Sequence, residues 1–182
     1  MTIGGIASAT LAESDSAYRK LERIQAGRLA PGTRIQFSPA ELNAWLNREA
    51  KQRAPQGVRN LRFVLANGSA TGYADIDFLK LHQAATGELP GWLAKNLFGG
   101  SRPVSVTARF QSRAGQARVD VERVEISGVA IEGRMLDFLV ADFLRPEFPD
   151  AQVSQWFRLR YGVDHFTVGP RGVIVAVTRP GS

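Results

Sequence analysis

Apolar and polar residues alternate along several stretches of the chain, and this alternation predicts antiparallel strands. Apolar positions from Leu61 to Leu65 run into Asn67-Gly68, a pair that tolerates positive φ, and the alternation then continues to Phe78. A second alternating stretch, Val104 to Gln111, leads to a turn at Ala114-Gly115. The sequence therefore predicts two successive β-hairpins.

The return strand of the second hairpin carries a slip in its alternation. Val119 and Val121 share one face, but the next apolar residues, Val124 and Ile126, are out of phase with them by one position. An extra residue at Glu122-Arg123 brings both pairs to the same face. This pattern predicts a β-bulge and a bent strand.

Other segments have the 3.6-residue period of helices. These are residues Leu11–Gln25, Pro39–Arg53, Leu89–Phe98 and Arg134–Arg145. Three further strands are expected at Thr33–Phe37, Phe157–Val168 and Val173–Thr178. Together these elements predict an α+β fold, a strongly bent antiparallel sheet packed on two or three helices. We expect an N-terminal helical arm at residues 1–30 and a single α+β domain at residues 31–182.

The helix at Pro39–Arg53 has the best-defined start in the chain. Ser38 can cap the free amide groups of the first turn, and Pro39, at the first helical position, has no amide to leave unpaired. Glu41 lies three residues after Ser38 and can accept a hydrogen bond from its amide, which completes a capping box. The sequence also places Leu42, Trp45, Leu46 and Ala50 on one apolar face.

Composition and charge narrow the class of protein. The 182 residues include no cysteine, which excludes disulfides and cysteine-ligated metals. The formal net charge is +6, but the arginines are scattered along the sequence, so we interpret the charge as a compositional bias. No apolar run reaches the roughly 18 residues of a membrane-spanning helix. Residues Met1 to Ala12 do not resemble an intact signal peptide, which leaves a cytoplasmic protein or a mature envelope protein with a new Met.

Candidate catalytic and metal-binding residues are few. Asp75 and Asp77 lie two apart on one predicted strand face near His82, and His165 is the only other histidine. Paired carboxylates can act as acid and base or hold a cation, but a solvated strand face gives the same pattern. The glycines near Gly100 lack the Lys-Ser/Thr of a phosphate loop. We expect no enzyme activity, no metal and no cofactor.

Aromatic residues stand at several boundaries between apolar and polar stretches. Trp45, Trp92 and Trp156 fit a ligand mouth or a membrane surface, although a core position is the default for each. The basic and aromatic segment Trp156–Tyr161 has the composition of a site that stacks single-stranded nucleic acid. A strand with one exposed face explains it equally well, so we do not expect nucleic acid as a partner.

The start of the second helix resembles a known group of proteins. Residues Ser38–Leu46, Ser-Pro-Ala-Glu-Leu-Asn-Ala-Trp-Leu, resemble the helix opening of uncharacterised bacterial envelope proteins, which look like small lipid-binding domains of the tubular lipid-binding (TULIP-like) type. The order of elements from Thr33 to Thr178 also resembles theirs, although only the helix opening matches in residues. The resemblance implies a curved antiparallel sheet wrapped on helices, an apolar groove, and a periplasmic or envelope location.

Small residues on the predicted inner sheet face leave room for such a groove beside the apolar helix at Arg134–Arg145. The expected groove residues are Ala70, Gly72, Ala74, Ala108, Met135, Leu136, Leu139 and Phe143. We expect a non-enzymatic binder or carrier of an apolar small molecule or lipid, with contact to a membrane surface. The alternative is a basic interaction module that uses arginines such as Arg109 and Arg118 against an acidic polymer or protein. A third interpretation, an enzyme with Asp75 or Asp77 as base, has the least support.

Overall fold

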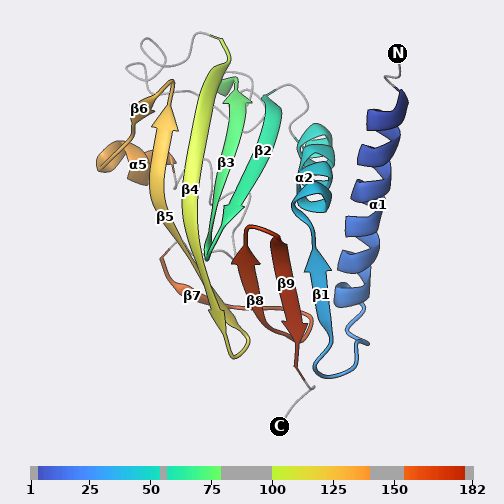
Figure 1. Ribbon diagram of the computed structural model, residues 1–182. Helices are drawn as coiled ribbons and strands as arrows, with labels where there is room; N and C mark the ends of the chain where they lie inside the picture. The colour runs from blue at the N-terminus through green and yellow to red at the C-terminus, as the bar shows by residue number, and fades with distance from the viewer. Residues whose placement is uncertain (1–3, 54–56, 79–99, 140–153, 179–182) are drawn as a thin grey trace.

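The computed structural model describes residues 4–53, 57–78, 100–139 and 154–178 (Figure 1). Its helices are α1 (Gly4–Gln25), α2 (Pro39–Arg53) and α5 (Arg134–Leu139). Its strands are β1 (Arg34–Phe37), β2 (Val58–Ala66), β3 (Ser69–Ile76), β4 (Arg102–Arg113), β5 (Gln116–Ile126), β6 (Val129–Ala130), β7 (Trp156–Arg158), β8 (Val163–Gly169) and β9 (Gly172–Val177). The fold is α+β, as the sequence predicted.

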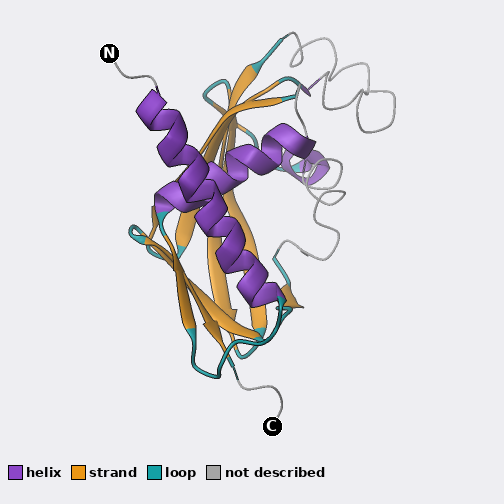
Figure 2. Cartoon of the chain, turned by 90° about the vertical axis from the view of Figure 1, so that its right-hand side faces the viewer, coloured by secondary structure: helices purple, strands orange, loops and turns teal. Residues whose placement is uncertain are grey.

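The strands form two antiparallel sheets. The larger sheet has six strands in the order β2-β3-β4-β5-β6, with β7 paired to the lower part of β5. The smaller sheet has the order β1-β9-β8. Figure 2 shows α1 and α2 crossing one another alongside both sheets, and the long strands of the larger sheet bend as they run past the smaller one. The helices and the smaller sheet thus lie on one side of the larger sheet, and we call the face toward them the inner face.

Both predicted hairpins are confirmed. β2 and β3 are joined at Asn67-Gly68, where Gly68 alone of the pair has a positive φ, 69°. β4 and β5 are joined at Ala114 and Gly115, which have φ of 47° and 72°. Both angles are positive, and such a turn matches the twist of the strands that it connects.

The predicted bulge in β5 is also confirmed. Thr107 of β4 pairs with Arg123, whereas the next residue, Ala108, pairs with Val121. Glu122 is therefore the extra residue. The bulge lets Val121 and Val124 both point to the inner face, although an odd number of positions separates them.

Two predicted boundaries are wrong. The first helix begins at Gly4 rather than Leu11. The single strand expected over Phe157–Val168 is two strands, because Tyr161 and Gly162 take φ of 59° and 69° and turn the chain between them. As a result β7 joins the larger sheet and β8 the smaller one. The expected helix at Leu89–Phe98 lies outside the described residues.

The described hydrophobic core has two separate clusters. One lies at the upper end of the larger sheet in Figure 1 and consists of Phe78, Val104, Val124, Ile126 and Ile131. The other joins α1 to the smaller sheet and consists of Ala17, Ile24, Ile35 and Phe37. Partly buried apolar residues of α1, α2 and the smaller sheet pack on the second cluster. The N-terminal helix therefore contributes buried side chains to the second cluster.

Ser112 connects the two sheets. Its hydroxyl donates to the carbonyl of Phe166 at 2.6 Å and accepts from the amide of the same residue at 2.8 Å. The ring of Phe166 also meets the ring of Phe110 edge-on, with 6.3 Å between centroids. The lower part of β4 and strand β8 are thus held together by a side chain where no regular ladder joins them.

Candidate functional site

The residues at the start of α2 have structural roles in this fold. The Ser38 hydroxyl accepts from the Glu41 amide at 3.1 Å, and the Glu41 carboxylate accepts from the Ser38 amide at 2.8 Å. This is the predicted capping box. A cap of this kind stabilises a helix by about 1 kcal/mol.

Glu41 also fixes α1 to α2. Glu41 is 8% exposed. Its carboxylate accepts hydrogen bonds from Lys20 Nζ at 2.6 Å and from the Ser16 hydroxyl at 2.6 Å. Burial by itself raises the pKa of this carboxyl. The hydrogen bonds from Lys20, Ser16 and the Ser38 amide, with the charge of Lys20, outweigh burial and hold the pKa below its usual value. Glu41 is therefore ionised and paired in the folded protein at neutral pH.

Asn43 covers the edge of the larger sheet. Its side-chain amide accepts from the Phe63 amide at 2.6 Å and donates to the Phe63 carbonyl at 3.0 Å. One turn later Asn47 donates to the Leu61 carbonyl at 2.6 Å. β2 is an edge strand, and its outward backbone groups need partners or cover. Glu41 and Asn43 of the Glu-Leu-Asn sequence therefore both have structural roles here.

The predicted groove residues of the strands do share the inner face. Ala70 pairs with Ala108, and Ala74 pairs with Val104, so a column of small side chains follows β3 beside β4. Ala70 is buried, whereas Ala74 and Ala108 are half-buried. Gly72 is partly filled from β2, because a Cβ atom there would lie 3.1 Å from the ring of Phe63.

The predicted groove residues of the helix are described only in part. Leu136 of α5 packs on the upper hydrophobic cluster. The side chains of Met135 and Leu139, residue Phe143 and the rest of the predicted helix after Leu139 lie outside what the structure describes. The groove as a whole remains a prediction.

The opposite face of the larger sheet, the outer face, is polar and carries paired charges. Arg109 pairs with Glu122 at 2.6 Å, Arg118 with Asp120 at 2.9 Å, and Arg123 with Glu125 at 2.5 Å. The hydrogen bonds and charge of Arg123, with a further hydrogen bond from Ser105, outweigh desolvation and lower the pKa of Glu125. These pairs neutralise much of the basic charge that the sequence suggested for this face.

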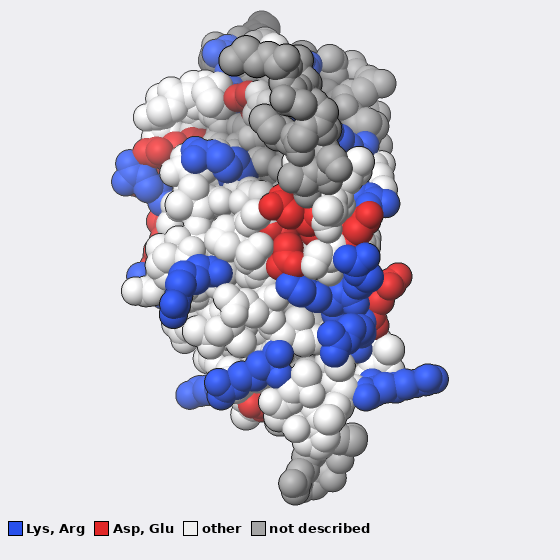
Figure 3. Space-filling view, turned by 45° about the vertical axis from the view of Figure 1, so that its right-hand side comes forward, with Lys and Arg blue, Asp and Glu red and all other residues white. Residues whose placement is uncertain are grey.

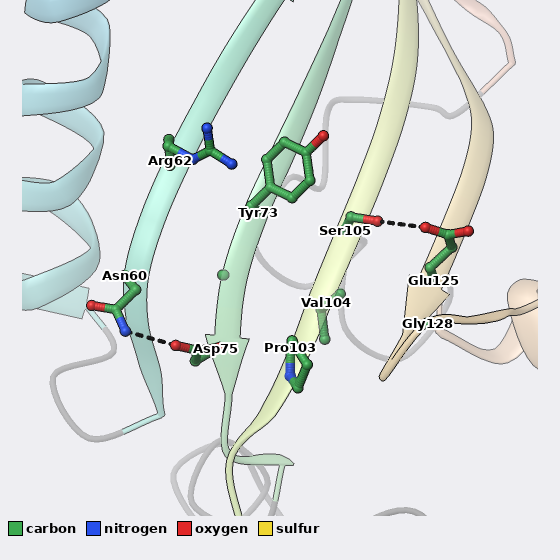
Figure 4. A pocket seen from close by; sticks show the side chains of 10 residues that line it. Asn60, Arg62, Tyr73, Asp75, Pro103, Val104, Ser105, Glu125 and Gly128 are labelled. Carbon is green, nitrogen blue, oxygen red and sulfur yellow. Dashed lines mark hydrogen bonds between the residues drawn. The ribbon is translucent and has the colours of Figure 1, made fainter.

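A shallow groove of about 330 Å³ lies on the outer face near the end of β3 and the start of β4 (Figure 4). The Arg62 guanidinium lies 4.6 Å from the centre of the Tyr73 ring at one side. Asp75 accepts from Asn60 at 2.6 Å, and Glu125 accepts from Ser105 at 3.3 Å. Both carboxylates are thus hydrogen-bonded to neighbouring side chains.

The candidate catalytic residues do not form a site in the described structure. Asp75 faces the outer groove, whereas Asp77 is buried just beyond the end of β3, where its amide donates to Gly57. His165 Nδ1 lies 2.7 Å from the Asp164 carboxylate, and His82 lies outside the described residues. Among the described residues, no group of three His, Cys, Asp or Glu side chains is placed to hold a metal ion.

The tryptophans have different surroundings. Trp45 packs on the cluster between α1 and the smaller sheet, a core position. Trp156 is half-buried on β7, with the Arg113 guanidinium 4.7 Å from its ring centre. Trp92 lies outside the described residues. Of the described tryptophans, Trp156 is the one placed at a polar boundary as the sequence suggested.

The structure also gathers arginines that are far apart in the sequence. Arg28, Arg34, Arg113 and Arg158 are all exposed and come from segments that meet at the lower end of the molecule in Figure 1. Figure 3 shows basic side chains on the lower part of the surface with little acidic surface between them. The sequence gives no sign of this grouping, because no local pattern brings these positions together.

Comparison with known proteins found no relative: no protein-family model, curated protein or solved structure matches the chain. No described helix has the length and apolar character that crossing a bilayer requires.

Proposed function

We propose that the protein is a non-enzymatic binder or carrier of an apolar ligand, most simply a lipid, and that it acts at the bacterial cell envelope. The hydrocarbon part of the ligand would lie on the inner face of the larger sheet, along β3. The resemblance of the Ser38–Leu46 segment to envelope proteins supports the location. An apolar site of this kind holds hydrocarbon without a set of specific polar groups.

One observation carries the proposal: small side chains line the inner face of β3 where it pairs with β4. Ala74 and Ala108 stay half-buried there, and so do their larger neighbours Val106 and Val121. Apolar surface of this kind is stabilised by further burial, at roughly 25 cal/mol for each Å² removed from water. A bound hydrocarbon chain would supply that burial.

The outer face gives less support to the alternative, a module that binds acidic partners through the sheet. Arg109, Arg118 and Arg123 already pair with carboxylates of the same face. An acidic partner would have to displace these carboxylates before it gained contact with the arginines. The carrier function on the inner face is therefore better supported than a binding module on the outer face.

A fluorescent fatty acid tests the carrier function directly. The wild-type protein should bind the probe, and Ala108→Trp should weaken binding by about tenfold or more, because the indole fills the space beside β3. Val64→Trp is the matched control, because Val64 lies on the outer face of β2 and is 45% exposed. Circular dichroism establishes that each variant is folded, and Ala108→Leu replaces the Trp variant if that variant unfolds.

Two results would overturn the proposal. One is the absence of probe binding by the folded wild-type protein. The other is an equal loss of binding in Ala108→Trp and Val64→Trp, which would show that the probe does not use the inner face.

A further inference from the structure

The lower end of the molecule in Figure 1 is built from four chain segments. They are residues 28–34 before and within β1, the β4–β5 turn at 113–116, the loop and strand ends at 158–164, and the end of β9 at 176–178. Backbone hydrogen bonds join them in a row: Gly32 to Val177, Thr178 to Gly162, Gly115 to Asp164, and Leu159 to Gly115. We call this surface the basic end.

Basic residues outnumber acidic ones at the basic end. Arg28, Arg34, Arg113 and Arg158 are exposed, and within the described part of the chain these four form no ion pair. Arg160 lies in the 158–164 segment of the basic end. The acidic side chain here, Asp164, is already engaged by His165 at 2.7 Å. Four exposed arginines, without an ion pair among the described residues, therefore share one end of the molecule.

The arginines on the outer face of the larger sheet differ from these four in their pairing. There, each of Arg109, Arg118 and Arg123 has a carboxylate within 3 Å on the same face. Charge that is already paired adds little to the field that an approaching partner meets. An anionic surface would thus be attracted more strongly to the basic end than to these paired arginines of the outer face.

Aromatic side chains border the same end. Tyr161 is 50% exposed, and half-buried Trp156 stands two residues before Arg158 with Arg113 stacked on its ring. Tyr and Trp have an apolar body and a polar tip, and both are enriched where a membrane meets water. The basic end is a rim of turns and strand ends, a shape that suits a broad surface better than a single extended strand.

We propose that the basic end docks on an anionic lipid membrane, with the arginines near lipid phosphates and with Trp156 and Tyr161 at the level of the headgroups. The choice of a membrane as partner rests on the proposed function, because a carrier of an apolar ligand has to exchange that ligand with a bilayer. An arginine near such a surface strengthens binding by about fivefold, so several together suffice for a reversible contact.

Vesicle sedimentation tests this inference. Vesicles of phosphatidylglycerol and phosphatidylcholine in equal amounts should bind the protein, whereas phosphatidylcholine alone should not, and added salt should weaken the binding. The triple variant Arg34→Gln, Arg113→Gln, Arg158→Gln should lose on the order of 100-fold in affinity. The control triple variant Arg62→Gln, Arg109→Gln, Arg123→Gln changes the net charge equally on the outer sheet face and should lose far less.

A second measurement uses the fluorescence of Trp156. Lipids that carry bromine near the headgroup should quench tryptophan fluorescence of the wild-type protein on anionic vesicles, and Trp156→Phe should remove most of this quenching. Because the vesicle assay contains no fatty-acid probe, it can fail while the probe still binds, and the reverse also holds. The two proposals are therefore tested separately.

Three outcomes would overturn the inference. The first is no binding to anionic vesicles at low salt. The second is an equal loss in the two triple variants, which would mean that net charge alone matters. The third is tighter binding to a single-stranded oligonucleotide than to the vesicles at the same salt concentration, which would assign the basic end to nucleic acid.

Discussion

Glu41 joins three parts of the structure through one carboxylate. It caps the first turn of α2, pairs with Lys20 and accepts from Ser16, both on α1. Lys20 in turn donates to the carbonyl of Gln36 in β1 at 2.7 Å. The orientation of α1 against α2 and β1 therefore depends on a buried charge that keeps all its partners.

Replacing this carboxylate tests its contribution to stability. Glu41→Gln retains an oxygen for the cap but removes the charge opposite Lys20, so the free energy of unfolding should fall by about 1.5–3 kcal/mol in chemical denaturation. Glu122→Gln is the control, because its pair with Arg109 is exposed and should contribute only about 0–1 kcal/mol. Equal losses in the two variants would contradict the importance of the buried pair.

The same carboxylate predicts a pH dependence. The pKa of Glu41 is lower in the folded protein than the ordinary value of a glutamate side chain, so folding favours the ionised form. Its contribution to stability is present above that value and is lost as the pH falls through the folded-state pKa. Between about pH 5 and about pH 3 the wild-type protein should lose more stability than Glu41→Gln. Denaturation curves at these pH values compare the two proteins.

Among the elements, β5 shows how one extra residue shapes a sheet. Glu122 is inserted where β5 pairs with β4, and the strand bends there. Because of the bulge, the apolar side chains of both halves of β5 point to the same inner face, although they are out of phase in the sequence. The upper cluster receives Val124 and Ile126, and Val121 packs beside it.

Single-residue deletions distinguish this bulge from an ordinary loop. Deleting Glu122 leaves regular alternation from Val119 to Ile126, so the protein should still fold, with a lower thermal midpoint because the bend is lost. Deleting Asp120 forces either Val119 outward or Glu122 inward, and this variant should be unfolded or severely destabilised. Circular dichroism and thermal melts measure both. A Glu122 deletion as damaging as that of Asp120 would contradict the assignment of the extra residue.

Across the whole molecule, hydrogen bonds outside the regular ladders join the two sheets. The Ser112 hydroxyl takes the place of a backbone partner for both polar groups of Phe166, and the Gly68 amide donates to the carbonyl of Val168. These contacts hold β8 against the turn of the first hairpin and the lower half of β4. The relation between the sheets also sets the position of the basic end.

Removing the Ser112 hydroxyl should loosen the smaller sheet selectively. Ser112→Ala leaves the Phe166 amide and carbonyl without their partner, which should cost about 1–3 kcal/mol. Hydrogen exchange should become faster at β8 amides such as Phe166 and Val168, while the β3–β4 ladder keeps its protection. Uniform acceleration in both sheets would show instead that the molecule opens as a single cooperative unit.

The sequence alone determined the local architecture. Alternation and turn chemistry predicted both hairpins, the phase slip predicted the bulge, and Ser38, Pro39 and Glu41 predicted the start of α2. These features depend on residues within a few positions of one another, so a strand or helix period and a capping pattern suffice to reveal them. The small residues of β3 on one face followed from the same alternation.

Only the tertiary structure decided the relations between distant segments. It divided the strands into two sheets, set Asn43 against the edge of β2, and brought Arg28, Arg34, Arg113 and Arg158 to one end. Each relation depends on which segments pack together, and the hydrophobic and polar pattern of a single segment does not specify its partners. Scattered arginines in the sequence therefore became a concentrated basic surface once the strand ends met.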